Sequence, residues 1–297
     1  MKQQGEARAQ RITKSGNEAT DHDESAAELS SEEKKQASED APKRVAVLHE
    51  TIRLQGEDEL GRTIAALWWS ALAAGLSMGF SFLFRGVLEA RFPEGNARFF
   101  IGNMGYTIGF LIVIIARQQL FTENTVTAVL PVMTKPDTTK FLKLLRLWSI
   151  VLLGNVVGAL IFSYILGKLD LFDAATDQAF LSIGEELMRN SASQMFTKGM
   201  LSGWLIATMV WMIAAAPEAK LWLILIVTYL IGLGGFSHIV VGSAEVAYLA
   251  FAGEVSWLEG ATHFAVPTLL GNIFGGTFIF ALISHAQVQS DNLHKKS

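Results

Sequence analysis

The stretch that decides the fold runs from Leu221 to Glu245 and reads LWLILIVTYLIGLGGFSHIVVGSAE. It is long and apolar enough to cross a bilayer, which takes about 20 such residues. Yet glycines interrupt it, and His238 lies among them. An ionisable group at bilayer depth is costly and points to function, and irregular backbone survives there only inside protein or beside a cavity. The stretch therefore predicts a broken membrane helix with a titratable side chain at the break.

Charge is concentrated ahead of the apolar part of the chain. The sequence has 297 residues, and residues 1–60 hold nine of its 24 basic and 14 of its 28 acidic side chains. The rest is nearly neutral, which indicates a membrane protein that crosses the bilayer several times. Residues 1–43 contain almost no large apolar side chain, so we expect a disordered acidic tail. Because cysteine is absent, disulfides and thiol chemistry are excluded.

Six apolar stretches of about 20 residues or more follow, the length that spans a bilayer. A short amphipathic helix at 44–61 is expected ahead of them, the membrane domain takes 62–287, and 288–297 form a cytoplasmic C-terminal tail. The second and fifth stretches are too long and too interrupted for plain helices, so each predicts two half-helices joined inside the membrane. The six stretches are 63–86, 99–134, 141–167, 194–216, 220–252 and 261–286.

A Leu-Gly-Asn-x-x-Gly motif and a helix break each occur twice in the sequence, and the two copies of each are separated by nearly the same number of residues. Leu153-Gly-Asn-Val-Val-Gly158 in the third stretch matches Leu270-Gly-Asn-Ile-Phe-Gly275 in the sixth, and Thr122 and His238 each lie at a break. These offsets indicate an internal duplication, and an odd number of spans per half makes the repeats inverted. The predicted fold class is an all-α membrane protein with six transmembrane helices in two inverted three-helix repeats, with helices two and five broken.

Polar side chains near the breaks need partners in an apolar setting. Asn155 and Asn272 are expected to hydrogen-bond backbone groups freed at the breaks, although the adjoining glycines also suit helix packing. Arg117, Glu123 and Glu245 are costly in a membrane unless paired. One interpretation is an ion pair of Arg117 with Glu245 or Glu123 that locks the loop. The other is that Arg117 attracts an anion while Glu123 gates it.

The distribution of basic residues predicts the orientation. Loops rich in Lys and Arg face the cytoplasm, and the loop after the second stretch is basic whereas those after the third and fifth are acidic. Both termini are therefore expected in the cytoplasm, although Arg85, Arg91 and Arg98 after the first stretch oppose this. The basic loop residues are Lys135, Lys140, Lys143 and Arg146.

These features together resemble the formate/nitrite transporter family over about residues 60–287: six spans, Leu120-Phe121-Thr122 at the second-span break, a histidine in the broken fifth span and the repeated Gly-Asn motifs. The segment from Arg117 to Val132 looks more like the YfdC-type inner-membrane branch than like the formate or nitrite channels. The resemblance implies an aquaporin-like protomer with its own pore, a homopentamer, a bacterial inner-membrane location, and passage of small monovalent anions such as formate, nitrite or hydrosulfide.

The resemblance also implies roles for single residues. His238 matches the central pore histidine of the family, and Thr122 matches the threonine that faces it. The chain departs from the family pattern at Glu123, directly after that threonine, and at Gly242, where an asparagine is usual. The constriction is matched by Leu120 and Phe121 and, by spacing only, by Tyr106, Phe110 and Ile231.

Crossing an apolar layer about 30 Å thick imposes a large desolvation cost on a small anion. Helix N-termini offer N–H groups and partial positive charge, and a histidine can hydrogen-bond the anion or give it a proton. We therefore hypothesise that His238 binds or protonates the anion and Thr122 orients it. The competing interpretation is a buried histidine that only pins the broken helix through a backbone bond.

Other functions stay open at this point. An aquaporin-like pore for water or neutral solutes fits the acidic Glu123, and a non-transporting scaffold or sensor fits the acidic tail. The sequence contains no phosphate-binding loop, dinucleotide fingerprint, metal cluster or nucleophile triad. We therefore expect neither an enzyme nor a cofactor or metal, and no nucleic-acid partner.

Overall fold

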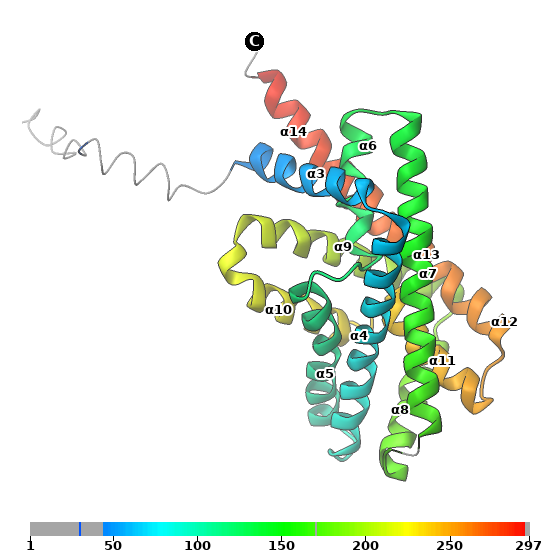
Figure 1. The fold of residues 1–297 in the computed structure, drawn as a ribbon. Helices are drawn as coiled ribbons and strands as arrows, with labels where there is room; N and C mark the ends of the chain where they lie inside the picture. Colours follow the sequence, from blue (N-terminus) through cyan, green and yellow to red (C-terminus); the bar gives the residue numbers. More distant parts are fainter. Residues whose placement is uncertain (1–29, 31–43, 170, 295–297) are drawn as a thin grey trace, which may run out of the picture. The chain divides into compact units, whose positions relative to one another are not determined.

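The computed structural model describes Ser30, residues 44–169 and residues 171–294, so the predicted disordered tail lies outside the described residues apart from Ser30. All the elements belong to the unit that begins at Arg44, and they are helical (Figure 1). The helices are α3 (Val45–Gly61), α4 (Ile64–Ala90), α5 (Asn96–Ile115), η1 (Glu123–Thr125), α6 (Leu130–Thr134), α7 (Thr138–Lys168), α8 (Ala174–Met188), α9 (Ala192–Ala215), η2 (Pro217–Ala219), α10 (Lys220–Leu233), α11 (Ile239–Ala252), α12 (Trp257–Glu259), η3 (Gly260–Ala265), α13 (Val266–Ile273), η4 (Phe274–Ala281) and α14 (Leu282–His294).

Five helices of the described chain are long and apolar enough to cross a membrane. They are α4, α5, α7, α9 and the continuous run Trp257–Ser290. The fifth predicted stretch is divided instead between α10 and α11, of 14 residues each, and each is shorter than the roughly 20 residues that a bilayer needs. The second stretch becomes α5, a non-helical segment with η1, and the short α6.

Side-chain caps explain where several helices start. The Thr63 hydroxyl accepts from the N–H of Ala66 at the start of α4, and Asp137 accepts from Lys140 at the start of α7. At α9, Ser191 and Gln194 form a reciprocal capping box. Such caps satisfy N–H groups that the first turn leaves without partners, so the polar residues ahead of each apolar run set its boundary.

Helix α8 was not anticipated, because its sequence reads as an acidic connection between the third and fourth stretches. Asp173 caps its first turn by accepting from Thr176. Its apolar face is buried, with Phe180 packed against Phe82 of α4 and Tyr248 of α11. The acidic residues therefore lie on the other face of an amphipathic helix that covers one end of the bundle.

Close backbone approach between long helices depends on the glycines of the repeated motif. A Cβ atom on Gly158 of α7 would lie 2.5 Å from the carbonyl oxygen of Leu72 in α4, which is closer than real Cβ contacts. A Cβ atom on Gly275 would likewise collide with the backbone of Met200 in α9. The repeated glycines thus let α7 pack on α4, and the sixth apolar run pack on α9, at short distance.

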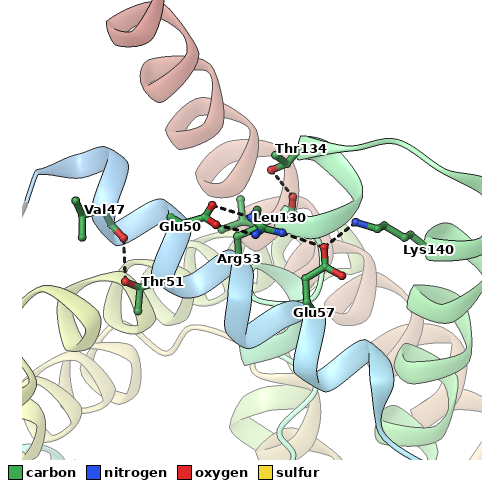
Figure 2. Close-up of polar contacts among 8 residues, drawn as sticks. All are labelled: Val47, Glu50, Thr51, Arg53, Glu57, Leu130, Thr134 and Lys140. Atoms are coloured by element: carbon green, nitrogen blue, oxygen red, sulfur yellow. Dashed lines mark hydrogen bonds and ion pairs between the residues drawn. The ribbon is translucent and has the colours of Figure 1, made fainter.

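The end of the bundle opposite α8 carries α3, α6 and α14 (Figure 1). Ile52 of α3 is buried with Val126, Leu130, Ala207 and Ala281. Arg53 bridges Glu50 and Glu57, and Lys140 of α7 also binds Glu57 at 2.7 Å (Figure 2). The hydrogen bond from Lys140 lowers the pKa of Glu57. Helix α3 is therefore attached to the bundle by apolar packing and by charge.

Helix α14 continues the sixth apolar run, and residues 288–294 of the predicted C-terminal tail are helical. Nε2 of His49 in α3 lies 3.0 Å from Nδ1 of His285 in α14. Before α14, η3 and η4 have wide turns of the i→i+5 type, which are rare within helices and frequent near functional sites.

Candidate functional site

Two interruptions of the helices meet inside the bundle. After α5 the backbone turns at Arg117, which has a positive φ of 54°, and helix resumes only at η1 and α6. After α10 it turns at Gly235, with φ of 55°, and α11 begins after His238. Positive φ is unfavourable for residues with a Cβ atom and easy for glycine, so only the second turn has the residue that suits it.

The amide groups of Asn155 and Asn272 hold these two interruptions in the same way. The Oδ1 atom of Asn155 accepts from the N–H of Phe121 at 2.9 Å, and its Nδ2 donates to the carbonyls of Ala71 and Gln119. The Asn272 amide accepts from Ile239 at 2.9 Å and donates to Gly199 and Ser237. Each buried amide satisfies two backbone groups that an interruption leaves open, and its third bond joins the interruption to an unbroken neighbouring helix, α4 for Asn155 and α9 for Asn272.

Thr122 and His238 are brought together where the two interruptions meet. Their Oγ1 and Nε2 atoms are 2.9 Å apart, and both residues are buried. Nδ1 of His238 accepts the N–H of Val241 at 3.4 Å and so caps α11. Because Nδ1 accepts a hydrogen bond, the proton of the neutral ring lies on Nε2, which donates to Thr122. The Thr122 hydroxyl proton is then available to another acceptor.

Of the predicted constriction residues, Phe110 lies directly against His238. The rings of Phe110 and His238 are 4.9 Å apart in an edge-on arrangement, and Tyr106 stacks obliquely on Phe110 at 5.5 Å. Leu120 and Phe121 are fully buried directly before Thr122. Ile231 is also fully buried. Aromatic rings of α5 therefore pack against the histidine of the pair.

A cavity of about 280 Å³ opens beside His238 on the side of α8. Tyr106, Ile231, Ser237, His238 and Glu245 are among its lining residues. Five of the lining residues are charged: the cations Arg85, Arg189 and Lys198 and the acids Glu186 and Glu245. A polar space with a surplus of positive charge thus reaches the buried histidine.

The predicted ion pairs of Arg117 with Glu123 or Glu245 are wrong. Arg117 is exposed at the first interruption and makes no ion pair within the described part of the chain, whereas Glu245 is buried and lines the cavity beside His238. Glu123 is half-buried, and the charge of Lys220 acts on it. The loop is instead secured by the Asn155 amide and by neighbouring polar side chains.

Several residues of this region escaped sequence reasoning. Thr125 donates to the Thr122 carbonyl, and Thr277 of η4 donates to the Thr125 carbonyl, both at 2.7 Å. Arg85 binds Glu89 and Glu186 at 2.8 Å each. The i, i+4 spacing of Arg85 and Glu89 in an apolar helix was the available signal. Among the described residues, no group of three His, Asp or Glu side chains is placed to hold a metal.

Comparison with known sequences identifies the family. Residues 46–286 match the family model for formate/nitrite transporters. The inner membrane protein YfdC of Escherichia coli K12 is 52% identical over 255 residues, which are 86% of this chain and 82% of that protein. The formate channel BtFdhC of Bacillus thuringiensis is 23% identical, over 80% of this chain and 93% of that channel.

Solved structures share the fold. A pentameric formate channel with formate bound has a TM-score of 0.67 at 20% identity, over 76% of this chain and 97% of that one. An ion channel described as a member of the FNT family has a TM-score of 0.64 at 24% identity, over 80% of this chain and 94% of that one. The matched family consists of transporters, which confirms the expectation that the chain is not an enzyme. Since the family model covers well over half of the sequence, the chain belongs to the formate/nitrite transporter family.

Proposed function

We propose that the protein is a membrane channel for small monovalent anions of weak acids, the class of formate and nitrite, and that a proton accompanies the anion. The observation that carries this proposal is the 2.9 Å contact between Thr122 and His238, buried at the end of a cationic cavity. Formate-channel names among the relatives and fold neighbours support the substrate class.

The route we propose runs from the cavity to the histidine–threonine pair. An anion is drawn into the cavity by its surplus of positive side chains. At the pair, the Thr122 oxygen accepts from Nε2–H of His238, so the Thr122 hydroxyl proton is the donor offered to the substrate, and the start of α11 adds partial positive charge. Beyond the pair the walls are apolar, with Leu120 and Phe121 fully buried. A neutral acid crosses such a layer at far lower cost than its anion.

The architecture that belongs to this proposal has six membrane-crossing segments, with α10 and α11 together forming the fifth. The equivalent roles of Asn155 and Asn272 support two inverted three-helix repeats. We further propose a homopentamer in a bacterial inner membrane with both termini in the cytoplasm. The pentamer rests on the solved formate channel, the location on the YfdC relative, and the orientation on the basic loop at 135–146.

The test is flux into proteoliposomes containing wild type, His238→Asn or His263→Ala. Asparagine is a good helix cap, so His238→Asn keeps the start of α11 while removing the imidazole. His263 lies outside the cavity lining and bonds the Asn190 carbonyl, so it serves as the matched histidine control. We expect formate and nitrite flux to fall at least tenfold in His238→Asn and to change less than twofold in His263→Ala.

Three other results would redirect the proposal. Glycerol flux without formate or nitrite flux would identify a neutral-solute pore. No flux of any solute in the wild type would favour a scaffold or sensor. Full formate flux in His238→Asn would show that the histidine only caps α11.

A further inference from the structure

The cavity follows one face of α11. The residues that α11 and its cap contribute to the lining are His238, Gly242 and Glu245, which are spaced i, i+4 and i+7. At 3.6 residues per turn these positions share a face, and seven residues place Glu245 about 10 Å from His238 along the helix axis. Phe264 packs against α11 at Gly242, where a Cβ atom would lie 2.5 Å from its ring, so the position between the two titratable groups has room for glycine alone.

Glu245 is an unusual lining group because it is buried without a bonded partner. Its residue is 4% exposed, and its carboxylate makes no hydrogen bond or ion pair among the described residues. Arg85, whose charge acts on Glu245, uses its Nε and Nη2 atoms for Glu89 and Glu186 instead. A buried carboxyl group that is aimed into a cavity and left unbonded is free to exchange a proton and to meet a ligand.

The elements packed around Glu245 supply few other titratable groups. Helix α4 contributes Arg85 and Glu89, helix α8 contributes Glu186, and Asp177 of α8 faces Tyr248 one turn further along α11. The segment η3 contributes His263, which is engaged with the Asn190 carbonyl. Arg189 and Lys198 complete the charged lining of the cavity. Of these acids, Glu89 and Glu186 are bound to Arg85, which leaves Glu245 as the unbonded carboxyl of the cavity.

We propose that Glu245 is the proton donor of the channel, so that the cavity takes up one proton together with one weak-acid anion. This inference rests on the proposed function and names the group that supplies the proton. When Glu245 takes up a proton, the lining gains one unit of positive charge and binds the anion more strongly. By linkage the bound anion favours proton uptake to the same extent.

The transfer step is balanced within the cavity. The carboxyl O–H bond of Glu245 breaks, its electron pair stays on the glutamate oxygen, and the proton forms the O–H bond of the departing acid. The neutral acid then passes His238 and Thr122. The Glu245 carboxylate, in the field of Arg85, regains a proton from water on the α8 side. Anions of strong acids cannot accept this proton, so the step selects weak acids over chloride or nitrate.

The experiment measures radiolabelled formate entry and internal acidification, read with a trapped pH dye, in proteoliposomes between external pH 5 and 8. Entry into protein-free liposomes is subtracted. In wild type we expect formate entry to rise as the pH falls, with about one proton per formate. In Glu245→Gln we expect protein-dependent entry at pH 6 to fall at least tenfold, and the remainder to be independent of pH.

Two matched variants separate proton donation from a loss of charge or shape. Glu245→Asp keeps an ionisable carboxyl group, and we expect it to restore the pH dependence. Glu254→Gln removes the same charge just beyond the end of α11, from an exposed residue outside the cavity lining, and we expect the wild-type profile. A wild-type pH profile and proton ratio in Glu245→Gln would overturn the proposal while leaving the proposed function intact.

Failures of the two proposals are distinguishable. If the wild type carries no formate, the proposed function fails and this inference fails with it. If Glu245→Gln does not assemble with the wild-type elution volume, the wild-type protein is treated with a hydrophobic carbodiimide and the modified residue is located by mass spectrometry. Formate entry that survives complete modification of Glu245 would overturn the inference.

Discussion

The two helix interruptions are supported in the same way but have different neighbours. Each has one buried asparagine amide with three backbone bonds. The first is also tied to the α3 end of the bundle, because Gln119 donates to Glu59 of α3 and accepts from Asn124. The second, from Gly235 to His238, lines the cavity. The same asparagine support thus holds a first interruption that is attached to α3 and a second interruption that lines the cavity.

Removing the shared support is expected to have the largest effect. Asn155→Ala and Asn272→Ala each leave buried backbone groups unsatisfied, at about 1–3 kcal/mol per group, so each should cost about 3 kcal/mol or more. Apparent melting temperatures in detergent, at one fixed scan rate, measure this. We expect similar losses for both variants if the interruptions are equivalent.

Asn190→Ala is the control for that measurement, because its amide bonds the Leu187 carbonyl at the partly exposed end of α8. A loss confined to Asn155→Ala, with Asn272→Ala behaving like the control, would show that the first interruption alone depends on its amide.

Separating α3 from the first interruption is expected to have an intermediate effect. Glu59→Ala removes the 2.8 Å bond from Gln119, and because Glu59 is partly exposed we discount its contribution to about 1 kcal/mol. Hydrogen exchange of residues 119–125 should then accelerate about fivefold, while residues 234–239 keep their rates. Glu50→Ala, on the same helix but bonded among the described residues to Arg53 alone, is the control. Equal acceleration in both interruptions would contradict the assignment of α3 to one side.

The smallest expected effect is an acid sensitivity at the α3 end. Burial, and then the neighbouring His285, lower the pKa of His49 from its ordinary 6.5. The folded protein therefore binds fewer protons at His49 than the unfolded chain once the pH falls below about 6.5, so this contribution to stability is lost on acidification. The apparent melting temperature should fall less between pH 7.5 and 5.5 in His49→Gln than in wild type. An identical fall in both proteins would show that His49 does not contribute.

Much of the fold was predictable because membrane spans carry a strong apolar signal. The polar residues at 117–125 and the glycines at 232–235 indicated where helices end, since backbone interruptions in such stretches need polar or small residues. Helix α8 was missed because its apolar side chain Phe180 packs against Phe82 and Tyr248, which come from distant parts of the sequence.

The site was predictable in its residues more than in its contacts. The spacing of Thr122 and His238 pointed to a pair, and the two atoms are within hydrogen-bond distance. The charges were paired incorrectly, because membrane cost predicts that partners exist and not which ones they are. Arg117 and Glu245 belong to different interruptions, and Glu245 lies two helical turns beyond the second one. The acid left without a bonded partner was therefore visible only in the structure.

The wide turns of η4 also have a consequence for the phase of the C-terminal helix. In a helix of 3.6 residues per turn, each residue added or removed rotates everything after it by about 100°. The i→i+5 turns between Phe274 and Ala281 thus determine the direction in which His285 points, and it points at His49. The rotation of α14 about its axis, and with it the contact of α14 with α3, is therefore determined by the turns of η4 inside the bundle. The same turns place Thr277 at the Thr125 carbonyl.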